Sequence, residues 1–408
     1  MKTFLKNTKL FIVCLLVSFQ LFSQSKKEPE SKPENLLDDK LDYWYKWIGV
    51  PHTSVTGLPT GTPTGDGMNG IPLGRNDFKN VFSAITLDGE KVLRATGEIY
   101  GGLTTKKEYE NYHLHLKYKW GKKKWAPRLT LPRDMGIMFH LTGTNEDAFW
   151  SVFMMGLECQ ISEGTSGDLF FVPNKDFKVS PAAEARVNDT KNWDSKAPLK
   201  KVGANTNYQS VTRSKNFESD STSWTAMDIY TVGSTGVFLV NGHVVMVFQN
   251  ANVVRADKTV TPLTKGRIQL QSEGAEGYYK DITIQSISEI PSEIRKSAGL
   301  DLLAAKAKQS TTSETTQTAS ANTADSSPFK EYIGSYRMQD SSSVKITGRD
   351  NDLFIQAGSF PEMKLIFKKT DEFAISAPSM QVEFLRKEHV VTEIKITYMG
   401  QPSVGKKE

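Results

Sequence analysis

Three stretches of the chain alternate between apolar and polar side chains at every second position, which is the pattern of a strand with one buried face. The positions in phase on the predicted core-facing side are Met135, Ile137 and Phe139, then Leu157, Cys159 and Ile161, then Ile268, Leu270 and Ser272. The opposite face of the first stretch carries Met138 and His140. If the three strands share one sheet, a set of polar side chains converges on one surface: His140, Glu158, Gln160, Gln269, Gln271 and Glu273. We predict that this surface is the active site.

The same alternation extends over most of residues 81–290 and predicts an all-β fold. In residues 112–120, aromatic and aliphatic side chains alternate with His and Lys. Asn241-Gly242 lies between two β-rich runs and predicts a two-residue hairpin turn, in which both positions favour positive φ. Many short strands, turns rich in glycine and no long helical period together favour a β-sandwich of the jelly-roll type.

Changes in composition divide the 408 residues into five segments. Residues 1–25 carry lysines, then a short apolar run, then small polar residues, which is typical of a secretory signal peptide. Residues 26–40 are charged and predict a flexible lead-in, and residues 41–292 form the sandwich. Residues 293–327 contain a helix-compatible piece and a linker rich in Ser, Thr and Ala. Residues 328–408 predict a small antiparallel barrel or half-barrel.

Charge and cysteine content exclude several classes of protein. Without residues 1–25, 48 basic side chains would face 46 acidic ones, a formal charge of +2 that indicates neither nucleic acid nor an anionic membrane as a partner. The signal-peptide pattern of residues 1–25 predicts an exported protein, periplasmic or extracellular, with no transmembrane segment after signal removal. Cys159 would be the single remaining cysteine, on the apolar side of its strand, so it predicts a core residue and excludes an intramolecular disulfide.

Carboxylates and amides recur along the predicted surface and suit a polyhydroxylated ligand, because carboxylates accept hydrogen bonds and Gln both donates and accepts. The predicted substrate-binding residues are Gln160, Glu163, Asp168, Gln269, Gln271 and Glu276. A solvated outer face of a sheet is the alternative. Glu98 and Asp228 are further acidic candidates. The aromatic residues that could stack on sugar rings are Trp44, Trp47, Trp150 and Tyr278, although aromatic residues in a sandwich more often belong to the core.

Histidines offer acid/base chemistry or metal binding. His140 with Glu158 could hold a divalent metal ion, but the sequence contains no tightly spaced metal motif such as HExxH. His113 and His115 form a second pair with the spacing i, i+2, on the polar side of their strand. No nucleophile elbow, phosphate-binding loop or dinucleotide fingerprint occurs in a suitable context, which disfavours serine hydrolases, nucleotide enzymes and dehydrogenases.

Several segments in order resemble the 3-keto-disaccharide hydrolase domain family: RDMGIMFH, FWSVFMMGLECQISEGTSGD, FLVNGHVVM and GRIQLQSEGAEGYYKDITIQSI. The resemblance covers roughly residues 44–291. It implies a concanavalin A-like jelly roll from environmental or gut bacteria, which acts on glycosides already oxidised at C3 of the sugar. It also implies that the positions His140, Glu158, Gln160, Glu163 and Glu273 lie around the site. The C-terminal run is similar to the small β-domain that some bacterial serine hydrolases carry.

A C3 ketone acidifies the hydrogen on C2, so a base can remove that hydrogen while the C1 oxygen leaves, after which water can add back. The candidate catalytic residues are Glu158 as base, His140 as acid or as ligand to a divalent ion, and Glu273. Direct hydrolysis by two carboxylates is an alternative mechanism. A non-catalytic carbohydrate-binding module and a purely structural surface protein are the alternative functions.

Overall fold

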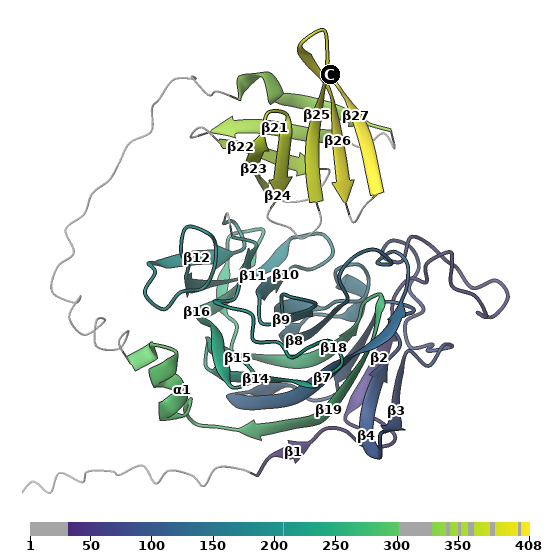
Figure 1. The fold of residues 1–408 in the computed structure, drawn as a ribbon, viewed down its shortest axis with the longest axis vertical. Coiled ribbons are helices and arrows are strands. Elements are labelled where there is room, and N and C mark those ends of the chain that lie inside the picture. Colours follow the sequence, from purple (N-terminus) through teal and green to yellow (C-terminus); the bar gives the residue numbers. More distant parts are fainter. Residues whose placement is uncertain are drawn as a thin grey trace, which may run out of the picture.

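A computed structural model of the chain describes residues 32–206, 208–301, 329–339, 343–349, 352–357, 363–375, 380–398 and 401–408. The predicted signal peptide lies in residues 1–31, outside this range, and so do residues 302–328, which hold most of the predicted linker. Within the described residues the fold is almost entirely β, as the alternating pattern predicts. Two antiparallel sheets form a sandwich, and a closed barrel follows at the C-terminus (Figure 1).

The larger sheet of the sandwich has eleven strands. Nine of them pair in the order β12-β11-β16-β15-β14-β7-β19-β4-β3, while β1 pairs with β19 and β17 with β16. Their bounds are β1 Glu34–Asn35, β3 Phe82–Leu87, β4 Glu90–Ala95, β7 Tyr112–Lys124, β11 Val179–Arg186, β12 Leu199–Gly203, β14 Thr225–Val232, β15 Thr235–Val240, β16 His243–Arg255, β17 Val260–Pro262 and β19 Ala275–Ser286.

The smaller sheet has eight strands, in the order β13-β10-β9-β8-β18-β5-β2, with β6 paired to β18. Their bounds are β2 Trp44–Ile48, β5 Gly101–Thr105, β6 Tyr109–Glu110, β8 Asp134–Thr142, β9 Met155–Ser162, β10 Leu169–Val172, β13 Ser210–Val211 and β18 Lys265–Ser272. The three stretches singled out in the sequence are therefore the neighbouring strands β9, β8 and β18, as predicted. A 3-10 turn, η1 (Asn145–Asp147), lies in the loop between β8 and β9.

The interior of the sandwich is built from the alternating apolar positions of both sheets. From β7, Tyr112, Leu114, Leu116 and Tyr118 are at most 1% exposed, and they face Ile137, Leu157, Cys159 and Leu270 of the smaller sheet. Burial of such side chains contributes roughly 1.5–3 kcal/mol each. Cys159 is fully buried in this core, as predicted.

The sequence prediction is right for the turn between β15 and β16 and wrong for part of the N-terminal segment. The hairpin at Asn241-Gly242 is confirmed, since β15 and β16 pair across it and Asn241 has φ of 47°. The predicted flexible lead-in is wrong for residues 32–40. Leu36 and Leu37 are buried, and β1 adds to the edge of β19 with the Leu36 amide donating to the Ile282 carbonyl at 2.8 Å. Two leucines among charged residues are enough to anchor this segment.

The C-terminal strands close into the predicted small barrel. Its strands run from β20 to β27 in sequence order and each pairs with the next, while β20 also pairs with β27. Their bounds are β20 Gly334–Met338, β21 Ser343–Arg349, β22 Asp352–Ala357, β23 Met363–Lys369, β24 Glu372–Ile375, β25 Met380–Lys387, β26 Val390–Tyr398 and β27 Gln401–Lys407. The short helix α1 (Ser292–Ser297) precedes the linker, and the 3-10 turn η3 (Lys330–Tyr332) opens the barrel. No helix among the described residues has the length and apolar character that a membrane crossing requires.

Candidate functional site

The centre of the candidate site lies over Gly136, on the outer face of the smaller sheet. Glu158 of β9 and Gln271 of β18 reach over this glycine from its two neighbouring strands. A β-carbon added to Gly136 would lie 2.2 Å from Glu158 Oε1 and 2.3 Å from Gln271 Oε1. The missing side chain therefore makes the space that these two polar groups occupy. Glu158 is 6% exposed and Gln271 is 1% exposed.

Next to this pair lies an ion-pair network around Arg128. Its guanidinium donates to Asp134 at the start of β8, and its Nη1 donates to Glu273 Oε1 at 3.2 Å. All three side chains are at most 8% exposed. The site therefore contains one buried cation and three buried carboxylates, of Asp134, Glu158 and Glu273.

Burial and mutual repulsion favour protons on these carboxylates. Burial, together with the negative charge of Asp134, raises the pKa of Glu158 to about 8, against smaller opposing effects of Gln271 and Arg128. The pKa of Asp134 rises to about 6, since burial outweighs the nearby Arg128. Burial also raises the pKa of Glu273, and Asp134 adds to the effect. One arginine cannot balance three ionised carboxylates, so at neutral pH the site retains protons that it can donate.

Several buried polar atoms of this site have no hydrogen-bond partner among the described residues: Arg128 Nε, Asp134 Oδ1 and Gln271 Oε1. Unpaired buried polar atoms are rare, because each costs roughly 1–3 kcal/mol. Their concentration in one place indicates that a polar ligand or ordered water completes them.

Aromatic side chains border the polar site. Tyr100 lies close enough to Arg128 and Glu273 to interact with them electrostatically. Its ring centroid is 6.1 Å from those of Trp150 and Phe153, which the loop between β8 and β9 contributes. Trp47 holds this loop, since its Nε1 donates to the Ser151 carbonyl at 2.9 Å. Met68, from the long segment between β2 and β3, packs in the same cluster, so part of this segment also lies near the site.

The predicted convergence of His140 with Glu158 and Glu273 is wrong. A bulge follows Phe139, where the pairing of β8 shifts against both neighbours, and His140 adopts a φ of 52°. The bulge turns its ring into the core, where its centroid is 5.8 Å from that of Tyr112 in the opposite sheet. His140 is 1% exposed, and burial lowers its pKa to about 4.

This position also contradicts the predicted metal site at His140 and Glu158. Their side chains extend from opposite faces of one sheet, so the two residues cannot bind the same ion. The structure therefore does not support a divalent metal ion held by this pair.

Three other predicted residues lie on β9 and the turn that follows it: Gln160, Glu163 and Asp168. Gln160 shares the face of Glu158, whereas Glu163 and Asp168 are engaged in ion pairs. Glu163 pairs instead with Arg133 at 2.7 Å, and its side chain is 39% exposed. Asp168 Oδ1 accepts hydrogen bonds from the Arg213 backbone amide and Nη1, each at 2.8 Å. Glu163 and Asp168 therefore fix loops at the edge of the sheet rather than reaching the centre of the site.

Gln269 and Glu276 also lie away from the centre. Gln269 is fully buried on the outer face, where its Nε2 donates to Thr104 Oγ1 at 2.9 Å and to the Val152 carbonyl at 3.2 Å. It thus anchors the loop between β8 and β9. Glu276 belongs to β19 in the larger sheet and pairs with Arg94 at 2.7 Å, so the prediction that it shares a surface with Glu158 is wrong.

The remaining candidates occupy other places. Trp47 and Trp150 border the site, whereas Trp44 is buried in the core and Tyr278 belongs to the larger sheet. Glu98 pairs with Lys79 at 3.3 Å. The structure brings a third group together, His113, His115 and Asp228, on the larger sheet.

Sequence reasoning missed Arg128 and Asp134. Asp134 lies two residues before Gly136 and four before Met138, so it shares their face of β8. Extending the alternation toward the N-terminus by one more residue pair would have placed it on the polar face. Arg128 lies in an irregular segment without periodicity, and no local signal indicates its position.

The family model of the 3-keto-alpha-glucoside-1,2-lyase-like domain matches residues 34–285, which include both sheets and every residue of the site. The chain belongs to this family. Membership in the family confirms the resemblance seen in the sequence and supports a carbohydrate-active protein. A second model, of a domain of unknown function named DUF3471, matches residues 318–407, the barrel region. No curated protein matches the chain.

Solved structures give weaker likenesses to this member of the family. A protein of Parabacteroides distasonis with the provisional name glycosyl hydrolase is 17% identical, with 63% of this chain and 100% of that chain covered and a TM-score of 0.33. The carbohydrate-binding module CBM66 of Bacillus subtilis is 9% identical, with 50% and 92% covered and a TM-score of 0.28. Domain 4 of the arabinanase AbnA of Geobacillus stearothermophilus is 10% identical, with 66% and 100% covered and a TM-score of 0.30. At such low identities and TM-scores, these likenesses do not bear on function.

Proposed function

We propose that this chain cleaves the glycosidic bond of 3-keto-glycosides by elimination across C1 and C2, and that rehydration gives net hydrolysis. The family match supports a glycoside as substrate. The observation that carries the proposal is the pair of buried, proton-retaining carboxylates, Glu158 and Glu273, beside Gln271 and Arg128. Elimination needs a base and a proton donor within one small site, and this pair supplies both.

In the proposed reaction, the ionised fraction of Glu158 removes the hydrogen on C2. The electron pair of that bond moves toward the C3 carbonyl and forms the enediolate. Its return forms the C1–C2 double bond while the C1–O bond breaks. Glu273 donates a proton to the departing oxygen, so the aglycone leaves as an alcohol. A base with a pKa of about 8 suits this step near neutral pH, because general bases work best when their pKa lies close to the working pH.

Other groups of the site bind the sugar. Gln271 Oε1 has no partner among the described residues and accepts a hydrogen bond from a sugar hydroxyl, while Gln160 extends the same polar face. Arg128 holds Glu273 in place and provides positive charge near the enediolate that forms when C2 loses its hydrogen. Trp47 and Trp150 provide aromatic surface at the border of the site for the second ring or the aglycone.

We also propose export to the periplasm or the extracellular space, on the basis of the signal-peptide pattern in residues 1–25. N-terminal sequencing of the protein from a host that secretes it would test this. We expect cleavage between residues 23 and 25, and an intact N-terminus retained in the cytoplasm would contradict it.

The test of the activity is incubation of the full chain with 3-keto-trehalose in D₂O, followed by proton NMR. Elimination predicts cleavage with replacement of the C2 hydrogen by deuterium, whereas direct hydrolysis would leave the C2 hydrogen in place. Unoxidised trehalose should remain intact, because its C2 hydrogen is not acidic.

Two variants assign the activity to the site. Glu158→Gln should abolish cleavage and leave sugar binding nearly intact, while Glu184→Gln, which changes a carboxylate of the larger sheet, should cleave at the normal rate. Binding of 3-keto-trehalose without any cleavage by the unaltered chain would refute the enzymatic proposal and favour the non-catalytic binding module.

A further inference from the structure

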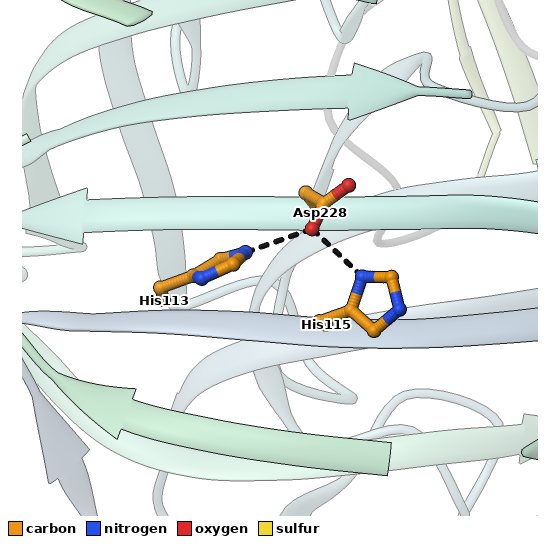
Figure 2. Close-up of side chains that lie close together, drawn as sticks. All are labelled: His113, His115 and Asp228. Atoms are coloured by element: carbon orange, nitrogen blue, oxygen red, sulfur yellow. Dashed lines mark hydrogen bonds and ion pairs between the residues drawn. The ribbon is translucent and has the colours of Figure 1, made fainter. Parts of the chain in front are cut away.

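His113, His115 and Asp228 lie together on the outer face of the larger sheet (Figure 2). Both histidines belong to β7, where they alternate with buried residues and so point away from the core. Asp228 belongs to β14 and lies directly opposite His115 in the antiparallel pairing, diagonal to His113. Residues in these relative positions of an antiparallel pair are close enough to interact.

The two imidazole rings approach one carboxylate oxygen. His113 Nε2 lies 2.7 Å from Asp228 Oδ1, and His115 Nδ1 lies 2.8 Å from the same atom. One ligand atom from each of the three residues lies within 4.8 Å of the other two, so a single ion could contact all three.

The surroundings hold the group in place and leave it open to solvent. The ring of His113 stacks on Tyr230 with centroids 4.0 Å apart and planes 5° apart. The side chains of His113, His115 and Asp228 are 23%, 27% and 15% exposed, so an ion can reach them from solution. The next outward cation on β7, Lys117, is neutralised by Asp281 at 3.0 Å.

We propose that His113, His115 and Asp228 bind a divalent transition-metal ion such as Zn²⁺, at a site separate from the glycoside site. Two imidazoles and one carboxylate match the ligands that such ions prefer, whereas Ca²⁺ and Mg²⁺ prefer oxygen ligands alone. Ligand atoms around tetrahedral zinc lie about 3.3 Å apart, so the carboxylate must move from each ring by roughly half an ångström. Rotations of the three partly exposed side chains allow this, and one coordination position stays free for water.

The site can hold metal independently of catalysis, because it lies on the opposite outer face of the sandwich from Glu158. An ion here would join β7 to β14 through side chains.

The experiment is titration of the chelator-treated, untagged full chain with Zn²⁺ by isothermal calorimetry, with bound zinc counted after dialysis. We expect one Zn²⁺ per chain, at least a tenfold loss of affinity in Asp228→Asn and in His115→Gln, and no competition from excess Mg²⁺. His243→Ala is the matched control, since it removes an exposed histidine of the same sheet that stacks on Phe217 at 4.1 Å. It should bind zinc normally.

A second measurement guards against misfolding of a variant. Co²⁺ bound to the unaltered chain should give the visible absorption of a site with nitrogen and oxygen ligands. A variant that keeps the native tryptophan fluorescence is folded. In each folded variant of Asp228 or His115, this absorption should be absent. Absence of stoichiometric zinc binding by the unaltered chain, or equal affinity in the variants, would overturn the proposal.

Discussion

Replacement of Glu158 by Gln should make the sandwich more stable, and the gain should grow with pH. Glu158 is buried, and its pKa of about 8 lies above the ordinary value of 4.5. Between pH 4.5 and 8, the folded chain therefore holds a proton that the unfolded chain has lost, so stability falls as pH rises through this range. Below pH 4.5 both states hold the proton, and the effect disappears.

The expected size follows from about 1.4 kcal/mol for each pH unit in this window. Relative to pH 4.5, the carboxyl of Glu158 should cost the folded state about 3 kcal/mol at pH 7. A glutamine side chain at this position cannot ionise, so the Glu158→Gln variant avoids this cost. Such a gain in stability at the expense of activity is expected where a catalytic group is kept in an unfavourable environment.

Urea unfolding followed by tryptophan fluorescence is the appropriate assay. All seven tryptophans of the chain lie between residues 44 and 224, so the signal reports on the sandwich and not on the barrel. The free energy of unfolding of both proteins is compared at pH 4.5, 6, 7 and 8. A difference between the proteins that stays constant over this range would refute the reasoning.

Glu163→Gln provides a control in which the free energy of unfolding should change in the opposite direction. Its hydrogen bond with Arg133 lowers the pKa of Glu163, so this carboxylate stabilises the folded state above the ordinary pKa, and that stability is lost as pH falls. The Glu163→Gln variant should therefore lose stability at neutral pH and match the unaltered chain in acid.

Two further predictions concern the same site. Arg128→Met leaves the ionised, buried carboxylate of Asp134 without its counter-charge and the Glu273 carboxyl without its hydrogen-bond donor, and it should lower the free energy of unfolding by about 3–5 kcal/mol at pH 7. The deficit should shrink toward pH 4 as Asp134, with a pKa of about 6, binds a proton, and an equal deficit at both pH values in urea unfolding would contradict this. Gly136→Ala should lower kcat/KM for 3-keto-trehalose by about 100-fold, because its β-carbon would displace Glu158 and Gln271 by roughly 1 Å. Unchanged kcat/KM would show that these two side chains do not form the reacting site.

The alternation of side chains was sufficient to predict much of the fold. It predicted that β8, β9 and β18 are strands with Ile137, Cys159 and Leu270 toward the core, because an extended backbone places successive side chains on opposite faces whatever surrounds it. The hairpin at Asn241-Gly242 followed from turn chemistry, which is equally local.

The same rule failed where the backbone departs from regular pairing. By the two-residue alternation, the side chain of His140 would lie on the polar face. The bulge after Phe139 instead turns this side chain toward the core. Bulges depend on how a strand fits both of its neighbours, which the sequence of one strand does not show. Glu276 has the same residue type as Glu273 and follows it by three residues, yet the chain has already passed the turn into β19 of the other sheet.

The sequence by itself determined the two faces of each strand where the pairing is regular, and it brought Glu158, Gln271 and Glu273 forward as candidates. Only the tertiary structure decided which of these polar groups meet. It placed Arg128 from an irregular segment between two carboxylates, and it joined His113 and His115 to Asp228, more than a hundred residues away. The physical reason is that the direction of a side chain on a strand is set by local geometry, whereas its partners are set by the order in which strands pair and loops fold back.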